Sequence, residues 1–383
     1  MVAEFAENIQ RIVVRLVRSD NLEPGNGRCG MIDHQNGLYD PPQRDPYRDT
    51  AEPQPMSKAG MTWRGIPRIS VVIPAYNVEK FIRQSVESVL EQDFPSFDCI
   101  VVDDGSTDRT ADILAEINDM RVKILRVENG GVSRARNIGY QAAKSDYILF
   151  LDGDDILHPT ALSRLYQAIE DRPDAVLVFG TTIRLLPSGK VEPNQKPVLK
   201  HHYSSGHILP EVVGRRNVFS NCGQMLIRRQ AIEAAGGFDP SLRLSEDWEF
   251  FCRLSARGEC VYIGPQEEIL RHRLRRDSTA PGLSANWKNH LPALEKVRTN
   301  NELSHVVGLQ RWISLIREVE AVHMFEAGRQ NFTRKDYMSA FRLMVRSLAR
   351  RPSKRRTAIF AAAVGSRLSG RALTPRLRAV QDD

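Results

Sequence analysis

The first half of the chain alternates between apolar runs and amphipathic segments. Residues 69–74 (ISVVIP) are rich in β-branched apolar side chains, which is typical of a strand buried on both faces of a sheet. The segment at 78–92 instead carries its apolar residues along one side of a helix. The predicted elements of this region are strands at 69–74, 99–102, 122–127 and 147–151 and helices at 78–92, 108–117 and 133–143. Short strands that alternate with helices predict an α/β fold, with a doubly wound and mostly parallel sheet covered by helices on both sides.

The remainder of the chain follows other patterns. Residues 1–67 include a long stretch rich in Pro, Gly, Asn, Asp and Arg without an apolar period, and we expect a disordered or poorly ordered arm there. A second strand and helix region occupies about 175–263, and the pattern after it becomes helical. We therefore predict an N-terminal arm at 1–67, an α/β domain at 68–283, and a helical C-terminal extension with a basic tail at 284–383.

The positive charge of the chain is concentrated near its C-terminus. The formal net charge is +7, and residues 342–380 contain 11 Lys and Arg residues and no Asp or Glu, which leaves −4 for the rest of the chain. This distribution argues against nucleic-acid binding, because the larger part of the chain is mildly acidic. Apolar residues are interspersed with the basic ones at 334–380. Two interpretations stay open for this tail: a peripheral helix on an anionic membrane surface, or a helical bundle packed against the α/β domain.

The cysteines and the N-terminus indicate the compartment. The five Cys residues show no CxxC pairing, so we expect reduced and mostly buried thiols rather than a zinc or disulfide framework. No run reaches the roughly 18–20 apolar residues that span a bilayer. Glu4 and Glu7 lie where a signal peptide would carry basic residues. We expect a cytoplasmic protein, peripheral at the inner face of the membrane if the basic tail binds lipid.

Polar clusters follow three of the predicted strands, at the sheet edge where doubly wound proteins bind ligands. They are the segments 74–77 (PAYN), 103–108 (DDGSTD) and 152–155 (DGDD). In the second cluster, a turn with a helix cap explains the later residues. It does not explain Asp103 and Asp104, whose mutual repulsion requires a compensating partner that a ribose or a base could supply.

The third cluster places three carboxylates within four residues, which is costly unless a cation neutralises them. Oxygen ligands of this kind select Mg²⁺, Mn²⁺ or Ca²⁺. A calcium-binding EF-hand is excluded, because its twelfth position falls at Ser163 and a strand rather than a helix precedes the loop. A loop with few protein ligands leaves room for diphosphate oxygens around Mg²⁺.

The chain has no GxGxxG or P-loop motif, so phosphate must be held by a metal and by basic side chains. Arg134 and Arg136, which follow Gly130 and Gly131, are the candidates. For one of the two, the alternative is a solvated position on the helix.

Taken in order, these motifs resemble those of family 2 glycosyltransferases with the GT-A fold. The resemblance covers about residues 68–275 and rests on the segments 71–77 (VVIPAYN), 102–108 (VDDGSTD), 133–139 (SRARNIG), 150–155 (FLDGDD), and 236–239 with 245–249 (GGFD and SEDWE). It implies transfer of a sugar from a nucleotide-diphospho-sugar, UDP-linked, to the hydroxyl of a sugar, glycan or lipid-linked acceptor. Inversion at the anomeric carbon, a divalent Mn²⁺ or Mg²⁺, and a role in polysaccharide or glycoconjugate synthesis are also implied.

The resemblance also implies roles for individual residues. Tyr76 would stack on the nucleobase and Asp104 would accept a hydrogen bond from it. The implied donor-binding residues are Pro74, Tyr76, Asn77, Asp103, Asp104, Arg134, Arg136 and Asp152. Asp152 and Asp154 would bind the metal, with His272 as a third ligand or, alternatively, a structural residue.

On the acceptor side, Asp247 would be the catalytic base, supported by Glu246. Trp248 would either line the acceptor pocket or pack in the core. Two other functions stay open. One is a binding module without turnover, which would have no need of the base; the other is a sugar-nucleotide pyrophosphorylase, whose glycine-rich signature is absent here.

Overall fold

The computed structural model describes residues 66–186, 188–191, 205–214, 218–274 and 286–369. The predicted arm at 1–67 therefore lies outside the described residues, except for its last two positions.

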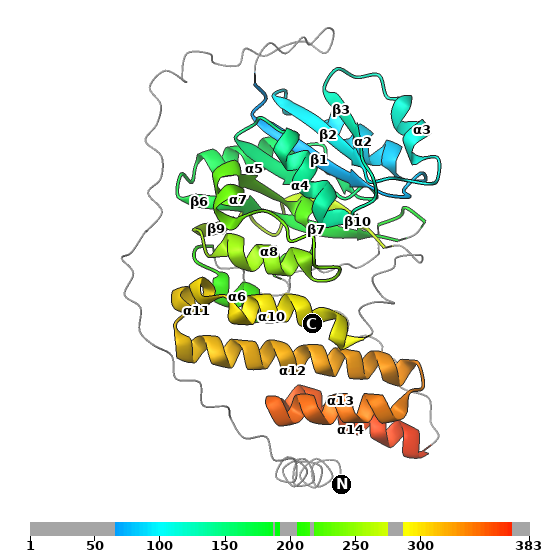
Figure 1. Cartoon of the computed structure of the whole chain (residues 1–383), viewed down its shortest axis with the longest axis vertical. Helices are drawn as coiled ribbons and strands as arrows, with labels where there is room; N and C mark the ends of the chain where they lie inside the picture. Colours follow the sequence, from blue (N-terminus) through cyan, green and yellow to red (C-terminus); the bar gives the residue numbers. More distant parts are fainter. Residues whose placement is uncertain (1–65, 187, 192–204, 215–217, 275–285, 370–383) are drawn as a thin grey trace.

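A seven-stranded sheet forms the centre of the α/β domain, in the order β3-β2-β1-β4-β8-β6-β9 (Figure 1). Its strands are β1 (Ile69–Ala75), β2 (Phe97–Asp103), β3 (Val122–Arg126), β4 (Tyr147–Phe150), β6 (Ala175–Phe179), β8 (Met225–Arg228) and β9 (Glu259–Tyr262). Neighbouring strands are parallel except at β8, which runs antiparallel to β4 and β6. The predicted α/β fold with a mostly parallel sheet is confirmed.

A second, three-stranded sheet positions a histidine beside the main sheet. It consists of β5 (Ile156–Leu157), β10 (Glu268–Arg273) and β7 (Thr181–Leu185), in the order β5-β10-β7. Strand β5 follows the acidic loop after β4 almost immediately, and β10 pairs with β5 in antiparallel register, with Arg271 opposite Ile156. His272 on β10 is therefore brought to the acidic loop by strand pairing.

Helices cover both faces of the main sheet because successive side chains of β1 point to opposite faces. Val71 and Ile73 belong to a core that also holds side chains of α2 and α5, whereas Val72 belongs to a core with side chains of α4, α7 and α8. The helices of this domain are α2 (Ile82–Leu90), α3 (Thr110–Ala115), α4 (Val132–Ala142), α5 (Ala161–Glu170), α6 (Leu209–Gly214), α7 (Arg229–Ala235) and α8 (Glu246–Ser255).

The first helix is shorter than the predicted 78–92. Asn77 has a left-handed backbone with φ 51°, and the amide of Val78 donates to Thr110 Oγ1 at 2.9 Å, so residues 78–81 form a turn before α2 begins. The extra turn lets the loop after β1 contact the loop after β2, and it is fixed by a partner 32 residues away.

The C-terminal part is helical, as predicted, and its layers lie below the α/β domain in Figure 1. Its elements are the short 3₁₀ helix η2 (Trp287–His290), α10 (Leu291–Thr299), α11 (Asn301–Val307), α12 (Leu309–Thr333), α13 (Tyr337–Arg350) and α14 (Lys354–Ser369). Met344 and Leu348 of α13 and Phe360 of α14 are buried against Phe325 of α12. The bundle interpretation of the tail therefore accounts for these apolar residues, which cannot also enter a membrane.

The predictions of buried, reduced cysteines and of no membrane-spanning segment can be compared with the described residues. Cys99, Cys222, Cys252 and Cys260 are free and buried, as expected of reduced thiols, and Cys29 lies outside the described residues. Among the helices that the structure describes, we find no segment with the length and apolar character needed to cross a membrane.

The packing of α4 on the sheet makes a prediction about stability. A Cβ atom at Gly139 would lie 2.3 Å from Val72 Cγ1, which belongs to a stiff β-branched side chain in the core. We expect Gly139→Ala to lower the free energy of unfolding by about 1–3 kcal/mol through overpacking. Urea denaturation measures this, with Gln141→Ala at an exposed position of the same helix as the control. Equal stability of the two variants would contradict the close approach of α4 to β1.

Candidate functional site

The loops after β1 and β2 are joined at the carboxyl edge of the sheet. The amide of Asp104 donates to the carbonyl oxygen of Ala75 at 2.9 Å. The Asn77 side-chain oxygen accepts the amide hydrogen of Thr107 at 2.9 Å, so Asn77 shapes the loop besides any contact with a donor. Tyr76 follows the end of β1 and is 48% exposed, which leaves its ring available for stacking. Pro74 is buried within β1, and its role in donor binding stays a prediction.

Asp103 and Asp104 are both buried and have partners within the chain. Asp103 accepts the amide hydrogen of Ser106 at 3.0 Å and therefore holds the turn. The two carboxylate oxygens of Asp104 accept the amide hydrogens of Gly130 and Gly131 at 2.9 and 2.8 Å. The partner that the pair requires is therefore supplied within the chain rather than by a ribose or a base. The contact of Asp104 with a nucleobase stays a prediction.

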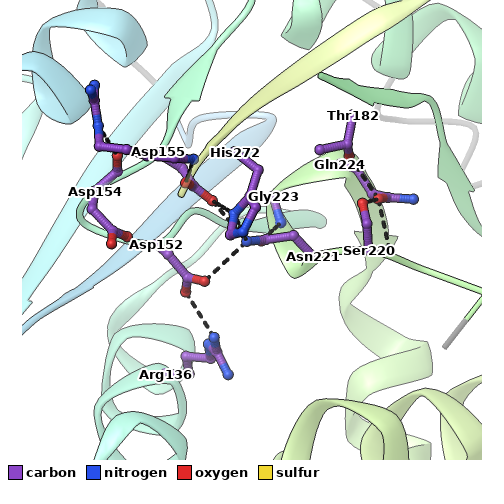
Figure 2. A network of polar contacts seen from close by, with 11 residues as sticks. Arg136, Asp152, Asp154, Asp155, Thr182, Ser220, Asn221, Gly223, Gln224 and His272 are labelled. Atoms are coloured by element: carbon purple, nitrogen blue, oxygen red, sulfur yellow. Dashed lines mark hydrogen bonds and ion pairs between the residues drawn. The ribbon is translucent and has the colours of Figure 1, made fainter. Parts of the chain in front are cut away.

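The acidic loop after β4 is organised around Asn221, which lies between Asp152, Asp155 and His272 in Figure 2. The Asn221 amide nitrogen donates to Asp155 at 2.7 Å and to Asp152 at 3.2 Å, and it lies 3.3 Å from His272 Nδ1. Asn221 caps the 3₁₀ helix η1 (Cys222–Gln224) by accepting the amide hydrogen of Gly223. One side chain thus joins the loop after β4, the segment before β8 and strand β10.

Asp155 is fully buried and is the structural carboxylate of the loop. It accepts the amide hydrogen of Arg273 at 2.8 Å and lies 3.2 Å from His272 Nδ1. Burial lowers the pKa of His272, but the hydrogen bond and charge of Asp155, with the nearby Asp152 and Asp154, outweigh it and raise that pKa to about 9. The acidic side chains around His272 therefore favour its protonated form.

Arg136 links the acidic loop to the start of α8. It is buried, and its guanidinium contacts Asp152 at 2.8 Å and Glu246 at 3.5 Å. The ring of Phe238 lies 5.0 Å from the guanidinium carbon and covers it. Burial alone would raise the pKa of Asp152, but the adjacent Arg136 is the main reason that this pKa is lowered instead. Asp152 is therefore ionised at the edge of the site.

The two acidic residues that begin α8 have the opposite tendency. The pKa of Glu246 is raised by burial and by the adjacent Asp247. The pKa of Asp247 is raised mainly by burial and, to a smaller extent, by the charge of Asp152. The first turn of a helix favours negative charge, so the carboxylates are tolerated there. A carboxylate with a raised pKa is suited to accept a proton from a substrate hydroxyl near neutral pH.

Two predicted site residues lie elsewhere. Arg134 is exposed and donates to the carbonyl oxygen of Glu128, so it is the surface residue of the arginine pair. Trp248 is 2% exposed, and its indole nitrogen donates to the carbonyl oxygen of Val212 at 3.1 Å. Trp248 is a core residue, which corrects the acceptor role: as the residue after Asp247, it projects from α8 at about 100° around the helix axis from the Asp247 side chain.

Sequence reasoning missed Asn221, Arg273 and the structural role of Asp155. Arg273 donates to the backbone oxygen of Asp154 at 3.0 Å and to Gln84 at 2.7 Å. The only signal for Asn221 in the sequence was a short polar stretch before a buried strand, and nothing indicated Arg273. Their partners are distant in the sequence: Asp155 lies 66 residues from Asn221, and Asp154 lies 119 residues from Arg273.

The fit of the site to a divalent cation rests on its donor atoms. No group of three His, Cys, Asp or Glu side chains in the described ranges is arranged to hold a metal ion. Asp152 and Asp154 nevertheless present carboxylates on one loop, and Mg²⁺ at nucleotide sites commonly takes only one or two protein carboxylates besides substrate phosphates. The residues therefore fit a cation that is shared with a diphosphate, not one caged by protein alone.

Comparisons with known proteins agree with this geometry. Residues 70–236 match the family model described as glycosyl transferase family 2. The uncharacterized glycosyltransferase EpsJ of Bacillus subtilis is 31% identical over 216 residues, which cover 54% of this chain and 60% of EpsJ. Chondroitin synthase of Pasteurella multocida is 27% identical over 63% of this chain and 24% of its own length. The chain thus spans less than two thirds of these relatives.

Solved structures show the same fold. The structure of S. aureus TarS 1–349 in complex with UDP-GlcNAc superposes with a TM-score of 0.52 at 18% identity, over 79% of this chain and 92% of that one. The likeness extends beyond the sheet into the helical C-terminal region. With this family match at the strand-end motifs and the GT-A fold around them, the resemblance of the chain to glycosyl transferase family 2 is confirmed over residues 70–236.

Proposed function

We propose that this protein transfers a sugar from a nucleotide-diphospho-sugar to an acceptor hydroxyl with inversion, in the synthesis of a polysaccharide or glycoconjugate. The observation that carries the proposal is the contact of Arg136 with both Asp152 and Glu246, because it holds the donor loop and the start of α8 together. A transferase needs these two parts at one place: an acidic loop for the donor and a base for the acceptor. A UDP-linked donor is the specific form of the proposal, supported by the UDP-GlcNAc complex of TarS.

The reaction follows from the positions of these groups. The acceptor oxygen attacks the anomeric carbon, the bond from that carbon to the diphosphate oxygen breaks, and the acceptor proton passes to the Asp247 carboxylate. Glu246 and Arg136 hold the base in place, and Tyr76 offers its exposed ring to the nucleobase. Asp152 and Asp154 would hold Mn²⁺ or Mg²⁺ together with the diphosphate; when bound, the cation stabilises the charge of the departing nucleotide.

The donor site can be tested by thermal stability, because a ligand that binds only the folded state stabilises it by an amount that grows with the ratio of ligand concentration to Kd. We expect one family among UDP-, GDP-, dTDP- and CMP-sugars to raise the melting temperature, more strongly with Mn²⁺. Asp154→Ala should remove the part that depends on metal, whereas Asp174→Ala at an exposed position should retain it. No stabilisation by any nucleotide at millimolar concentration would refute the donor site.

The base can be tested by its pH dependence. Asp247 must be deprotonated to act, and its pKa is raised, so the rate should fall as the pH drops through a midpoint above the ordinary value of about 3.9. Because Glu246 lies beside it, this midpoint belongs to the pair. Asp247→Asn should lower kcat by about 10²–10⁴-fold while donor stabilisation persists, and Asp174→Asn should not.

These results also separate the alternatives. Donor binding without release of nucleotide from any sugar nucleotide would identify a binding module. Formation of a sugar nucleotide from a sugar phosphate and a nucleoside triphosphate would identify a pyrophosphorylase. If the protein does transfer sugar, an Asp247→Asn variant with wild-type kcat would contradict the assignment of the base.

The proposal includes a division of labour along the chain and a location. Residues 68–283 would carry the donor and acceptor sites, and 284–383 would support them. Buried free thiols are typical of a reducing compartment and support a cytoplasmic location. The proposed acceptor is a sugar, glycan or lipid-linked molecule.

We also propose that the outward face of α13 contacts anionic membrane lipid. Met338 is 66% and Phe341 is 42% exposed on this face, next to the exposed Arg342 and Arg346. No ion pair involves these two arginines within the described ranges, so their charge is available to anionic headgroups, each basic residue contributing about 1 kcal/mol. Residues 370–380 of the predicted tail lie outside the described residues.

Sedimentation with vesicles tests this contact. At low salt we expect the protein to co-sediment with vesicles containing phosphatidylglycerol and not with neutral phosphatidylcholine vesicles. The double variant Arg342→Glu/Arg346→Glu should lose most of the binding, whereas Lys144→Glu/Arg172→Glu, with the same change of charge at exposed positions of the α/β domain, should keep it. Equal binding by the two double variants would exclude α13 as the contact.

A further inference from the structure

The residue that precedes α8 is held in an unfavourable backbone conformation. Ser245 has φ 60° and ψ 25°, and it is one of three described non-glycine residues with positive φ. The left-handed conformation is unfavourable for a residue that carries a Cβ atom, so it persists only where the surroundings impose it. Ser245 directly precedes Glu246 and Asp247, the residues proposed to support and supply the base.

The C-terminal extension provides the group that holds Ser245. Ser245 Oγ lies 2.9 Å from Nδ1 of His290, a buried residue at the end of η2. The His290 ring packs on His323 of α12, with centroids 4.6 Å apart, and His323 lies 6.2 Å from the ring of Trp248. These contacts connect the long helix α12 to both the start and the buried side of α8.

The polar contact on the sheet side of the first turn of α8 is longer. Arg136 reaches Glu246 at 3.5 Å, the long limit of a hydrogen bond, while its shorter contact at 2.8 Å is to Asp152. The direction in which the first turn of α8 leaves the loop is set by the backbone angles of Ser245. A change at Ser245 would therefore redirect Glu246 and Asp247 together.

We infer that His290 is a positioning residue: through its hydrogen bond to Ser245 it sets the orientation of the acidic first turn of α8. His290 acts through Ser245, the residue directly before the acidic first turn. The inference rests on the proposed role of Asp247 for its effect on catalysis, but not for its effect on the structure of α8. It makes the C-terminal extension part of the acceptor side of the site.

Two substitutions separate the hydrogen bond from the packing of the ring. His290→Phe keeps a ring against His323 and removes the hydrogen bond, whereas His290→Asn places a polar atom near the position of Nδ1 and removes the ring. We expect His290→Phe to lower kcat for release of UDP from UDP-sugars about tenfold with donor KM unchanged, the typical effect of one hydrogen bond. His290→Asn should stay within about threefold of wild type, and the exposed control His305→Phe should match wild type.

A second measurement does not depend on activity. Hydrogen exchange of the backbone amides at 246–250 should be faster in His290→Phe and in Ser245→Ala than in wild type, and near wild type in His290→Asn. The double variant Ser245→Ala/His290→Phe should be no worse than either single one, because both remove the same bond.

Several outcomes would overturn the inference. The first is a wild-type kcat and exchange rate in folded His290→Phe. The second is an equal loss of kcat in His290→Phe and His290→Asn, and the third is additive losses of kcat in the double variant. The second and third outcomes would mean that His290 only fills space. If wild-type protein neither binds nor cleaves any sugar nucleotide, the proposed function fails, and the exchange rates still decide whether His290 orders α8.

Discussion

The site depends on one buried cation. Arg136 contacts Asp152 and Glu246 from α4, which is itself packed closely on β1 through Gly139. A buried guanidinium is stable only with its counter-ions, and removing one partner of a buried ion pair typically costs about 3–5 kcal/mol. The acidic loop and the start of α8 are separated by more than 90 residues in the sequence, yet both are fixed by the same side chain. The distance between the proposed donor loop and the proposed base is therefore constrained by the sheet and α4.

The acidic loop has its own internal balance. Asn221 and Arg273 satisfy Asp155 and leave Asp152 and Asp154 at the edge of the loop. His272 contributes a positive charge at the same place, with a pKa of about 9. Asp155 is thus buried to hold the loop, and Asp152 and Asp154 are the proposed contacts of a ligand. Such a division is what a site needs if its cation arrives together with the substrate rather than residing in a protein cage.

Much of this could be predicted from the sequence, because the strands of the α/β domain are apolar runs of the expected length and the polar motifs fall at their ends. The limits were set by contacts between distant residues. The compensation of Asp104 by the amides of Gly130 and Gly131 depends on where a neighbouring loop folds, which no local pattern contains. Trp248 could have faced either side of α8; its partner Val212 belongs to α6, a helix that the sequence pattern did not indicate. The apolar stripe of α13 was visible, but not the face of α12 that buries it.

The arrangement of α8 explains why a family domain would carry a helical extension. A helix that presents a base at its first turn is exposed at that turn, where backbone groups lack helical partners and the chain is most easily displaced. Here the sheet side of the turn is held by Arg136 and the opposite side by the Ser245–His290 contact, while Trp248 fixes the buried side through Val212. Each of these contacts comes from a different segment, and two of the rings packed behind α8, His290 and His323, belong to the extension. The helices after the α/β domain thus complete the support of the acidic turn, which the sheet alone contacts from one side only.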